Sequence, residues 1–143
     1  MFYGELGHDF KEIYAFTYPT VFSYLDSKIK GKNIADFFVK HNINSIAICI
    51  RGVLNNLGEL FYKDIANSEI DVKYFIDKSY YNIFSGGISG KPVIGLDELQ
   101  NREPVDAYIV APIYYFNEIA DDLVSAGIEI DKIISLTDVI FDM

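Results

Sequence analysis

The sequence contains one cysteine and no long apolar run, and both shortages exclude classes of protein. Cys49 has no second cysteine with which to form a disulfide or a multi-cysteine metal site, so a reducing compartment suits the chain best. No apolar stretch approaches the ~20 residues that a membrane-spanning helix requires. Residues 1–10 also lack the basic and apolar regions of a signal peptide. We therefore expect a cytoplasmic protein without a transmembrane segment.

Basic residues are scarce as well. The chain has 12 Lys and Arg against 21 Asp and Glu, a formal net charge of −9, and its basic residues are scattered. Because affinity for nucleic acids comes largely from the neutralisation of phosphates, we expect no nucleic-acid partner. The motifs G-x-S-x-G, G-x-x-x-x-G-K-[ST] and H-E-x-x-H are absent from the sequence. No set of residues in the sequence can be identified as a catalytic acid, base or nucleophile. This favours a protein that is not an enzyme, but it does not decide whether the protein is one.

What the chain does contain suits one folded domain. Half of its 143 residues are hydrophobic, which is enough for a substantial core. Five short runs are almost continuously apolar, as is typical of parallel strands covered on both faces: residues 45–50, 72–76, 91–94, 107–111 and 132–136. Between these runs, helical periodicity or composition predicts helices at residues 57–65, 96–100 and 116–127. Thr137 is expected to cap a closing helical turn that runs to Phe141.

Two helical segments come before the first predicted strand. Residues 19–29 place Phe22, Leu25 and Ile29 on one apolar stripe, and the second segment has Asn33 as its candidate cap. In the first of these helices Tyr24 and Lys28 have the Tyr-x-x-x-Lys spacing of short-chain dehydrogenases. Because the pair precedes the first strand, we interpret this spacing as a coincidence of an amphipathic helix.

The order of these elements predicts an α/β fold of the three-layer, Rossmann-like kind. We expect a mostly parallel sheet of about five strands with helices on both faces, preceded by an N-terminal helical segment. Residues 1–31 are assigned to this N-terminal helical extension. Residues 32–143 are assigned to the Rossmann-like domain.

The loop after the first predicted strand is the first candidate for a binding site, because ligands of open parallel sheets lie at the carboxyl ends of the strands. It contains Arg51, Gly52, Asn55, Asn56 and Gly58. This is a degenerate form of the G-x-G-x-x-G turn, whose glycines let backbone N–H groups approach a pyrophosphate. Asparagine can replace glycine in left-handed conformations, and Arg51 could pair with a phosphate. The loop is therefore either a nucleotide-binding turn or an ordinary turn on a fold that has lost cofactor binding.

Three further candidates follow other strands. Asp77 ends the second strand at about the distance past the loop at which an acidic residue binds a ribose hydroxyl in this fold. Its alternative interpretation is a solvated aspartate that begins a turn. Pro112 and Tyr114, together with Tyr115, follow the fourth strand and would face the same crevice. There they could stack on a base or border a sugar, or they could simply pack.

Five blocks carry a resemblance to a known group of domains: residues 45–50 with Gly58, then 72–77, 90–99, 106–111 and 133–139. Their order resembles the Rossmann-like NAD- or CoA-binding-type domains of bacterial polysaccharide-biosynthesis proteins. Such domains occur in nucleotide-sugar dehydratases and epimerases, at the front of sugar acyltransferases, and beside glycosyltransferases. The resemblance implies turn-forming roles for Gly52 and Gly58 and a ribose-binding role for Asp77. Residues 50–58 depart from the glycine pattern of these domains, and their length is closer to that of CoA-binding domains.

The resemblance favours a noncatalytic nucleotide- or nucleotide-sugar-binding module that serves bacterial surface-polysaccharide biosynthesis. The candidate cofactors or ligands are NAD(P), CoA and a nucleotide sugar. A glycosyltransferase is the candidate protein partner, and a homodimer is the candidate assembly. Two alternatives stay open: a protein-interaction module whose cofactor site has decayed, and a part of an NAD-dependent enzyme that modifies nucleotide sugars.

Overall fold

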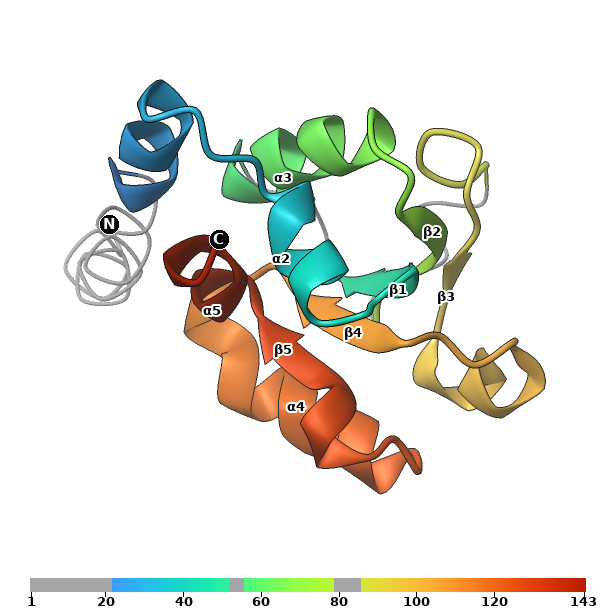
Figure 1. Ribbon diagram of the computed structural model, residues 1–143. Coiled ribbons are helices and arrows are strands. Elements are labelled where there is room, and N and C mark those ends of the chain that lie inside the picture. Colours follow the sequence, from blue (N-terminus) through green and yellow to red (C-terminus); the bar gives the residue numbers. More distant parts are fainter. Residues whose placement is uncertain (1–21, 52–55, 79–85) are drawn as a thin grey trace, which may run out of the picture.

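The computed structural model describes residues 22–51, 56–78 and 86–143, which form an α/β fold of the Rossmann-like kind (Figure 1). Its centre is a five-stranded sheet in the order β3-β2-β1-β4-β5, and every neighbouring pair is parallel. The strands are β1 (Ser45–Cys49), β2 (Asp71–Ile76), β3 (Val93–Ile94), β4 (Ala107–Val110) and β5 (Ile133–Ser135). All five predicted strands are confirmed, and the first along the chain is the central one.

Helices cover both faces of the sheet, as predicted. On one face lie α2 (Ala35–Lys40), α3 (Asn56–Ala66) and α5 (Leu136–Phe141), and on the other lie α4 (Phe116–Ser125) and the 3-10 helix η2 (Leu96–Asn101). Two short 3-10 helices, η3 (Ile113–Tyr115) and η4 (Ile130–Lys132), precede α4 and β5.

The central strand shows why two cores form. Successive side chains of a strand point to opposite faces of the sheet. Ile46 and Ile48 of β1 therefore belong to the core that includes Phe61 of α3, whereas Ala47 and Cys49 belong to the core that includes Leu123 of α4. The result is the three-layer arrangement that the continuous apolar runs predicted.

The strand order sets the place where a ligand can bind. From β1 the chain moves outward to β2 and β3, crosses back to β4, and then moves outward in the other direction to β5. The change of direction falls between β1 and β4. In open α/β sheets, ligands bind outside the carboxyl ends of the strands at such a switch point.

The helix at residues 22–29 is attached to α3 through Tyr24. This side chain is 1% exposed and belongs to the core that contains Ile46 and Ile48. Its hydroxyl donates a hydrogen bond to the Asp64 carboxylate of α3, and Lys28 Nζ forms an ion pair with the same carboxylate at 2.8 Å. The Tyr24 and Lys28 side chains therefore meet at Asp64 and have a structural role in this helix.

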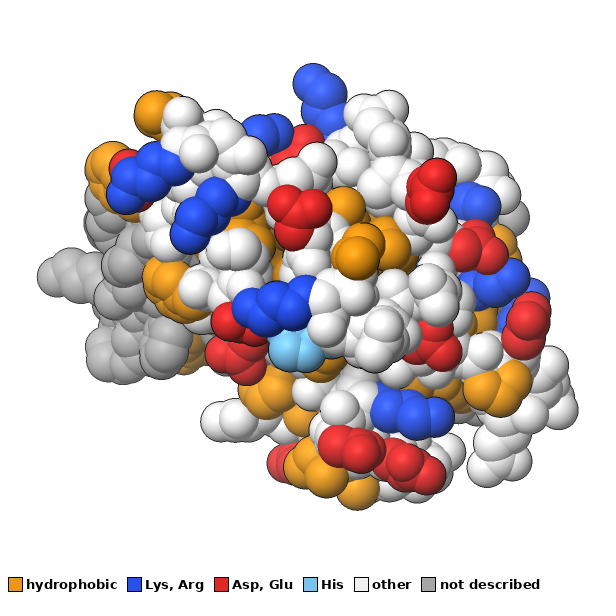
Figure 2. Space-filling model, in the orientation of Figure 1, with side chains coloured by type: hydrophobic (Ala, Val, Ile, Leu, Met, Phe, Trp, Pro, Cys, Tyr) orange, Lys and Arg blue, Asp and Glu red, His pale blue; other side chains and the backbone are white. Residues whose placement is uncertain are grey.

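The apolar stripe predicted for this helix lies on its solvent side. Phe22, Leu25 and Ile29 are 55%, 45% and 85% exposed. Figure 2 shows hydrophobic and basic side chains side by side over this end of the molecule. The helix thus uses an amphipathic tyrosine for packing and leaves its purely apolar residues outside the core.

Of the two predicted helix caps, Asn33 is confirmed in function and Thr137 is wrong. The Asn33 side chain accepts a hydrogen bond from the Ala35 amide at 2.9 Å, and Gly127 follows α4 with a φ of +100°. Thr137 does not cap α5. The helix begins earlier than predicted, so Ser135 is the N-cap and its Oγ accepts from the Thr137 amide at 3.2 Å.

Candidate functional site

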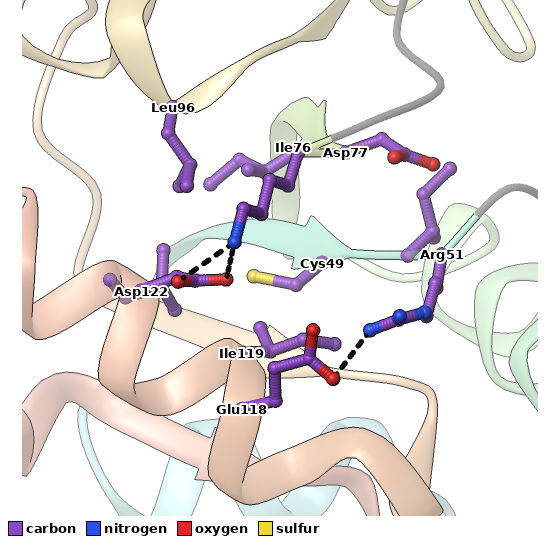
Figure 3. Close-up of a pocket in the computed structure, with 11 residues that line it drawn as sticks. Cys49, Arg51, Ile76, Asp77, Leu96, Glu118, Ile119 and Asp122 are labelled. Carbon is purple, nitrogen blue, oxygen red and sulfur yellow. Dashed lines mark hydrogen bonds and ion pairs between the residues drawn. The ribbon is translucent and has the colours of Figure 1, made fainter.

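A small pocket lies at the carboxyl ends of β1 and β2, beside α4 (Figure 3). Its volume is about 60 Å³. The floor is apolar and the rim is charged. The lining residues are Cys49, Ile50, Ile76, Leu96, Ile119 and Leu123 on the floor, and Arg51, Lys78, Glu118 and Asp122 at the rim; the buried Asp77 completes the lining. This is the edge of the sheet at which the strand order predicts a ligand.

The backbone of two parallel strands brings the first of these charges together. Arg51 follows β1 and Asp77 follows β2, which are hydrogen-bonded neighbours. The Ile50 amide donates to the Ile76 carbonyl at 2.9 Å, and the Asp77 amide donates to the Ile94 carbonyl at the same distance. Arg51 and Asp77, both predicted as site residues from the sequence, therefore line one pocket.

The opposite wall comes from α4. Glu118 and Asp122 are one helical turn apart and thus lie on the same side of the helix. Glu118 Oε2 is 2.7 Å from Arg51 Nη1, and Asp122 Oδ2 is 3.3 Å from Lys78 Nζ. Two ion pairs therefore connect the carboxyl ends of the strands to α4.

Arg51 is held from a second side. The guanidinium carbon lies 4.1 Å from the centre of the Tyr115 ring, which is within the range of a cation–π contact. Tyr115 in turn packs edge-to-face on Tyr114, with ring centres 5.2 Å apart. Tyr114, a predicted site residue, thus supports the pocket indirectly, through Tyr115 and Arg51.

Asp77 is the most buried charged residue described in the structure, at 1% exposed. Its carboxylate points away from Asp122 (Figure 3). Such burial is not compatible with the alternative interpretation of Asp77 as a solvated aspartate at a strand end. A carboxylate withheld from water needs hydrogen-bonding partners, and it binds a donor more strongly than an exposed carboxylate does.

The remaining predicted site residues either lie near this pocket or belong to the segments that the structure does not describe. Gly52 and Asn55 lie outside the described residues. Asn56 begins α3, and Gly58 is buried in the same helix. Pro112 is buried just before η3 and does not line the pocket.

Three charged residues of the pocket were missed from the sequence: Lys78, Glu118 and Asp122. The spacing of Glu118 and Asp122 on one face of a helix was a usable signal for an ion-pairing surface. Their partners were not predictable, because the pairs cross from α4 to two strands that are distant in sequence.

The floor of the pocket carries an unreactive thiol. Cys49 is 1% exposed, and this burial raises its pKa to about 12. The thiol is thus protonated at neutral pH and is a poor nucleophile. It contributes to the apolar floor.

Comparisons with known proteins leave the family open: no protein-family model matches the chain, and neither does any curated protein sequence. Among the described residues, no group of three or more His, Cys, Asp or Glu is arranged to hold a metal ion. No helix in the part of the chain that the structure describes is long and apolar enough to cross a membrane.

Proposed function

We propose that this protein is a noncatalytic module that binds a nucleotide or nucleotide sugar at the carboxyl edge of its sheet. The observation that carries the proposal is Asp77, a carboxylate that is 1% exposed at the end of β2 and lines a pocket next to the switch point. In this fold an acidic residue at that place accepts hydrogen bonds from ribose hydroxyls.

The chemistry of the pocket favours binding over catalysis. Burial keeps the Cys49 thiol protonated, and the rim carboxylates Glu118 and Asp122 are engaged in ion pairs. No histidine is among the described lining residues. An apolar floor with a few convergent polar groups is the usual composition of a ligand site.

A role in bacterial surface-polysaccharide biosynthesis is the biological setting that we propose for this module. It rests on the resemblance of the chain to domains of such proteins, and it makes UDP-, CDP- or GDP-linked sugars the first ligands to examine. NAD(P) and CoA follow from the same resemblance, and a glycosyltransferase is the proposed protein partner.

The test is thermal unfolding of the purified protein with NAD(H), NADP(H), CoA, acetyl-CoA and UDP-, CDP- and GDP-linked sugars. A ligand at one hundred times its Kd adds about 2.7 kcal/mol, a shift of several degrees for a domain of this size. We expect Asp77→Asn to abolish the shift. Asp121→Asn, the same change at an exposed position of α4 outside the pocket, is the matched control.

Two results would contradict the proposal: no ligand shifts the unfolding temperature, or the shift persists in Asp77→Asn. The unfolding temperature without ligand must be measured for both variants. This step separates a lost site from a lost fold, because Asp77 is buried.

A second candidate function is self-association through the exposed stripe of Phe22, Leu25 and Ile29. Beside it, Asp26 and Lys30 form an ion pair at 2.9 Å, so both charge signs are present at its edge. A second copy related by a twofold axis would cover the apolar stripe of both copies. Sedimentation should then show a dimer that Ile29→Glu dissociates and Asp77→Asn leaves intact. A monomer at all concentrations would exclude this function.

A further inference from the structure

Both cations of the pocket are already paired within the protein. Arg51 is paired with Glu118, and Lys78 is paired with Asp122. Asp77 adds a third carboxylate to the same lining. Carboxylates therefore outnumber cations in the lining, which is unusual for a site that would receive a phosphate group.

An anionic group that entered this pocket would have to compete with α4. If a phosphate took Arg51, it would displace Glu118, and an unpaired carboxylate would remain beside the phosphate. The same holds for Lys78 and Asp122. Like charges at such distances repel and raise the cost of binding. The cation–π contact with Tyr115 also holds Arg51 near α4.

An uncharged group with several hydroxyls meets no such competition. Its hydroxyls can donate to carboxylate oxygens and accept from the guanidinium and ammonium groups without breaking either ion pair. Its apolar ring face can lie on the floor formed by Cys49, Ile76 and Ile119. A sugar ring has this combination of polar edges and an apolar face.

We propose that Glu118 and Asp122 determine the ligand class of the pocket: they reserve it for the sugar ring of the ligand and keep phosphate groups out. This inference rests on the proposed function and deepens it. The selecting groups belong to α4, whereas Asp77, the carboxylate proposed to bind the ligand, follows β2.

The test compares nucleosides with their diphosphates by isothermal titration calorimetry in low salt, where charge effects are least screened. The probes are uridine with UDP and adenosine with ADP. In the wild-type protein, each bound nucleoside is expected to have a Kd within about threefold of that of its diphosphate, because the phosphates gain little. Free glucose and galactose form the second arm. If they saturate the site while uridine and adenosine do not, the hexose of a nucleotide sugar is the ring that enters, and if the nucleosides saturate it, the ribose does.

Glu118→Gln supplies the decisive variant. It removes the charge that opposes a phosphate and keeps the size of the side chain. The affinity for the diphosphate should rise about two- to fivefold relative to that for the nucleoside, the range expected when one partly exposed ion pair is opened. Glu98→Gln is the matched control, because Glu98 pairs with Arg102 at 3.5 Å within one helical turn and lies outside the pocket lining.

The outcomes of these titrations distinguish a failure of the selective role of α4 from a failure of the proposed function. If the diphosphate binds more than about tenfold tighter than the nucleoside in the wild type, or if Glu118→Gln leaves their ratio unchanged, the selective role of α4 is wrong while nucleotide binding stands. If none of these probes binds, and no nucleotide sugar, NAD(P) or CoA compound shifts the unfolding temperature, the proposed function itself fails.

Discussion

Replacement of Tyr24 by alanine should cost more stability than any other single truncation in the helix at residues 22–29. Tyr24 is 1% exposed and packs in the core, whereas Phe22 in the same helix is 55% exposed. Truncation of a fully buried aromatic side chain to alanine costs about 3–5 kcal/mol. Because this helix covers the margin of the core, we expect the lower end of that range, about 3 kcal/mol.

A smaller change separates the ring of Tyr24 from its hydroxyl. Tyr24→Phe keeps the packing and removes the hydrogen bond to Asp64. A hydrogen bond to a charged group contributes about 1.5–3 kcal/mol when buried. The Asp64 side chain is 21% exposed and keeps its ion pair with Lys28, so we expect a loss of about 1 kcal/mol.

The assay is urea unfolding followed by circular dichroism, with Phe22→Ala as the control. The control should change the free energy of unfolding by less than about 0.5 kcal/mol, as is usual for exposed positions. If Tyr24→Ala costs less than about 1 kcal/mol, the helix is not part of the cooperative unit, and the packing inferred for it is wrong.

Four other predictions concern the start of α5, the pocket floor and the end of the chain. Thr137 Oγ1 is buried without a hydrogen-bond partner among the described residues, so Thr137→Val should raise the free energy of unfolding by about 1 kcal/mol. Ser135→Ala should lower the free energy of unfolding by about 1 kcal/mol, because it removes the cap of α5. Urea unfolding measures both changes. Cys49 should resist iodoacetamide at pH 8 in the folded protein and react on unfolding, since burial raises its pKa to about 12; rapid alkylation of the folded protein would show that the thiol is accessible. The hydrogen bond to His41 lowers the pKa of Asp142. The stabilisation that the Asp142 carboxylate contributes is therefore present above the ordinary carboxyl pKa and is lost as the pH falls through the lowered value. Thermal unfolding should show that Asp142→Asn is less stable than the wild type near neutral pH and equal to it in strong acid. A difference that is independent of pH would refute this role.

Most of the fold could be predicted because its signals are local. Each strand is a short run of apolar residues, and a run covered on both faces needs no alternation of polar residues. The helix end at Gly127 is equally local, since a φ of +100° favours glycine. The prediction of Thr137 as a cap was wrong because local sequence does not distinguish the two candidates. Ser135 and Thr137 are both good caps, and only the exact end of β5 decides between them.

The site could be predicted in part. Arg51 and Asp77 were found because the carboxyl ends of parallel strands meet at one edge whatever the details of the helices. Glu118 was not found, because its position depends on how α4 lies across that edge. The packing of Tyr24 on α3 was missed for a similar reason, since apolar periodicity pointed to Phe22 and Ile29, and the burial of a tyrosine depends on a partner for its hydroxyl.

The central claim is that a ligand binds at the carboxyl edge of the sheet, and an NMR titration tests it most directly. The ¹H–¹⁵N spectrum of the labelled protein would be followed during addition of NAD⁺, CoA and UDP-glucose in turn. We predict that at least one of them moves the backbone amide signals of Arg51, Asp77, Lys78 and Glu118, with little change around Arg102 at the opposite edge. Unchanged signals at those four residues in all three titrations, or changes centred on the opposite edge, would contradict the account.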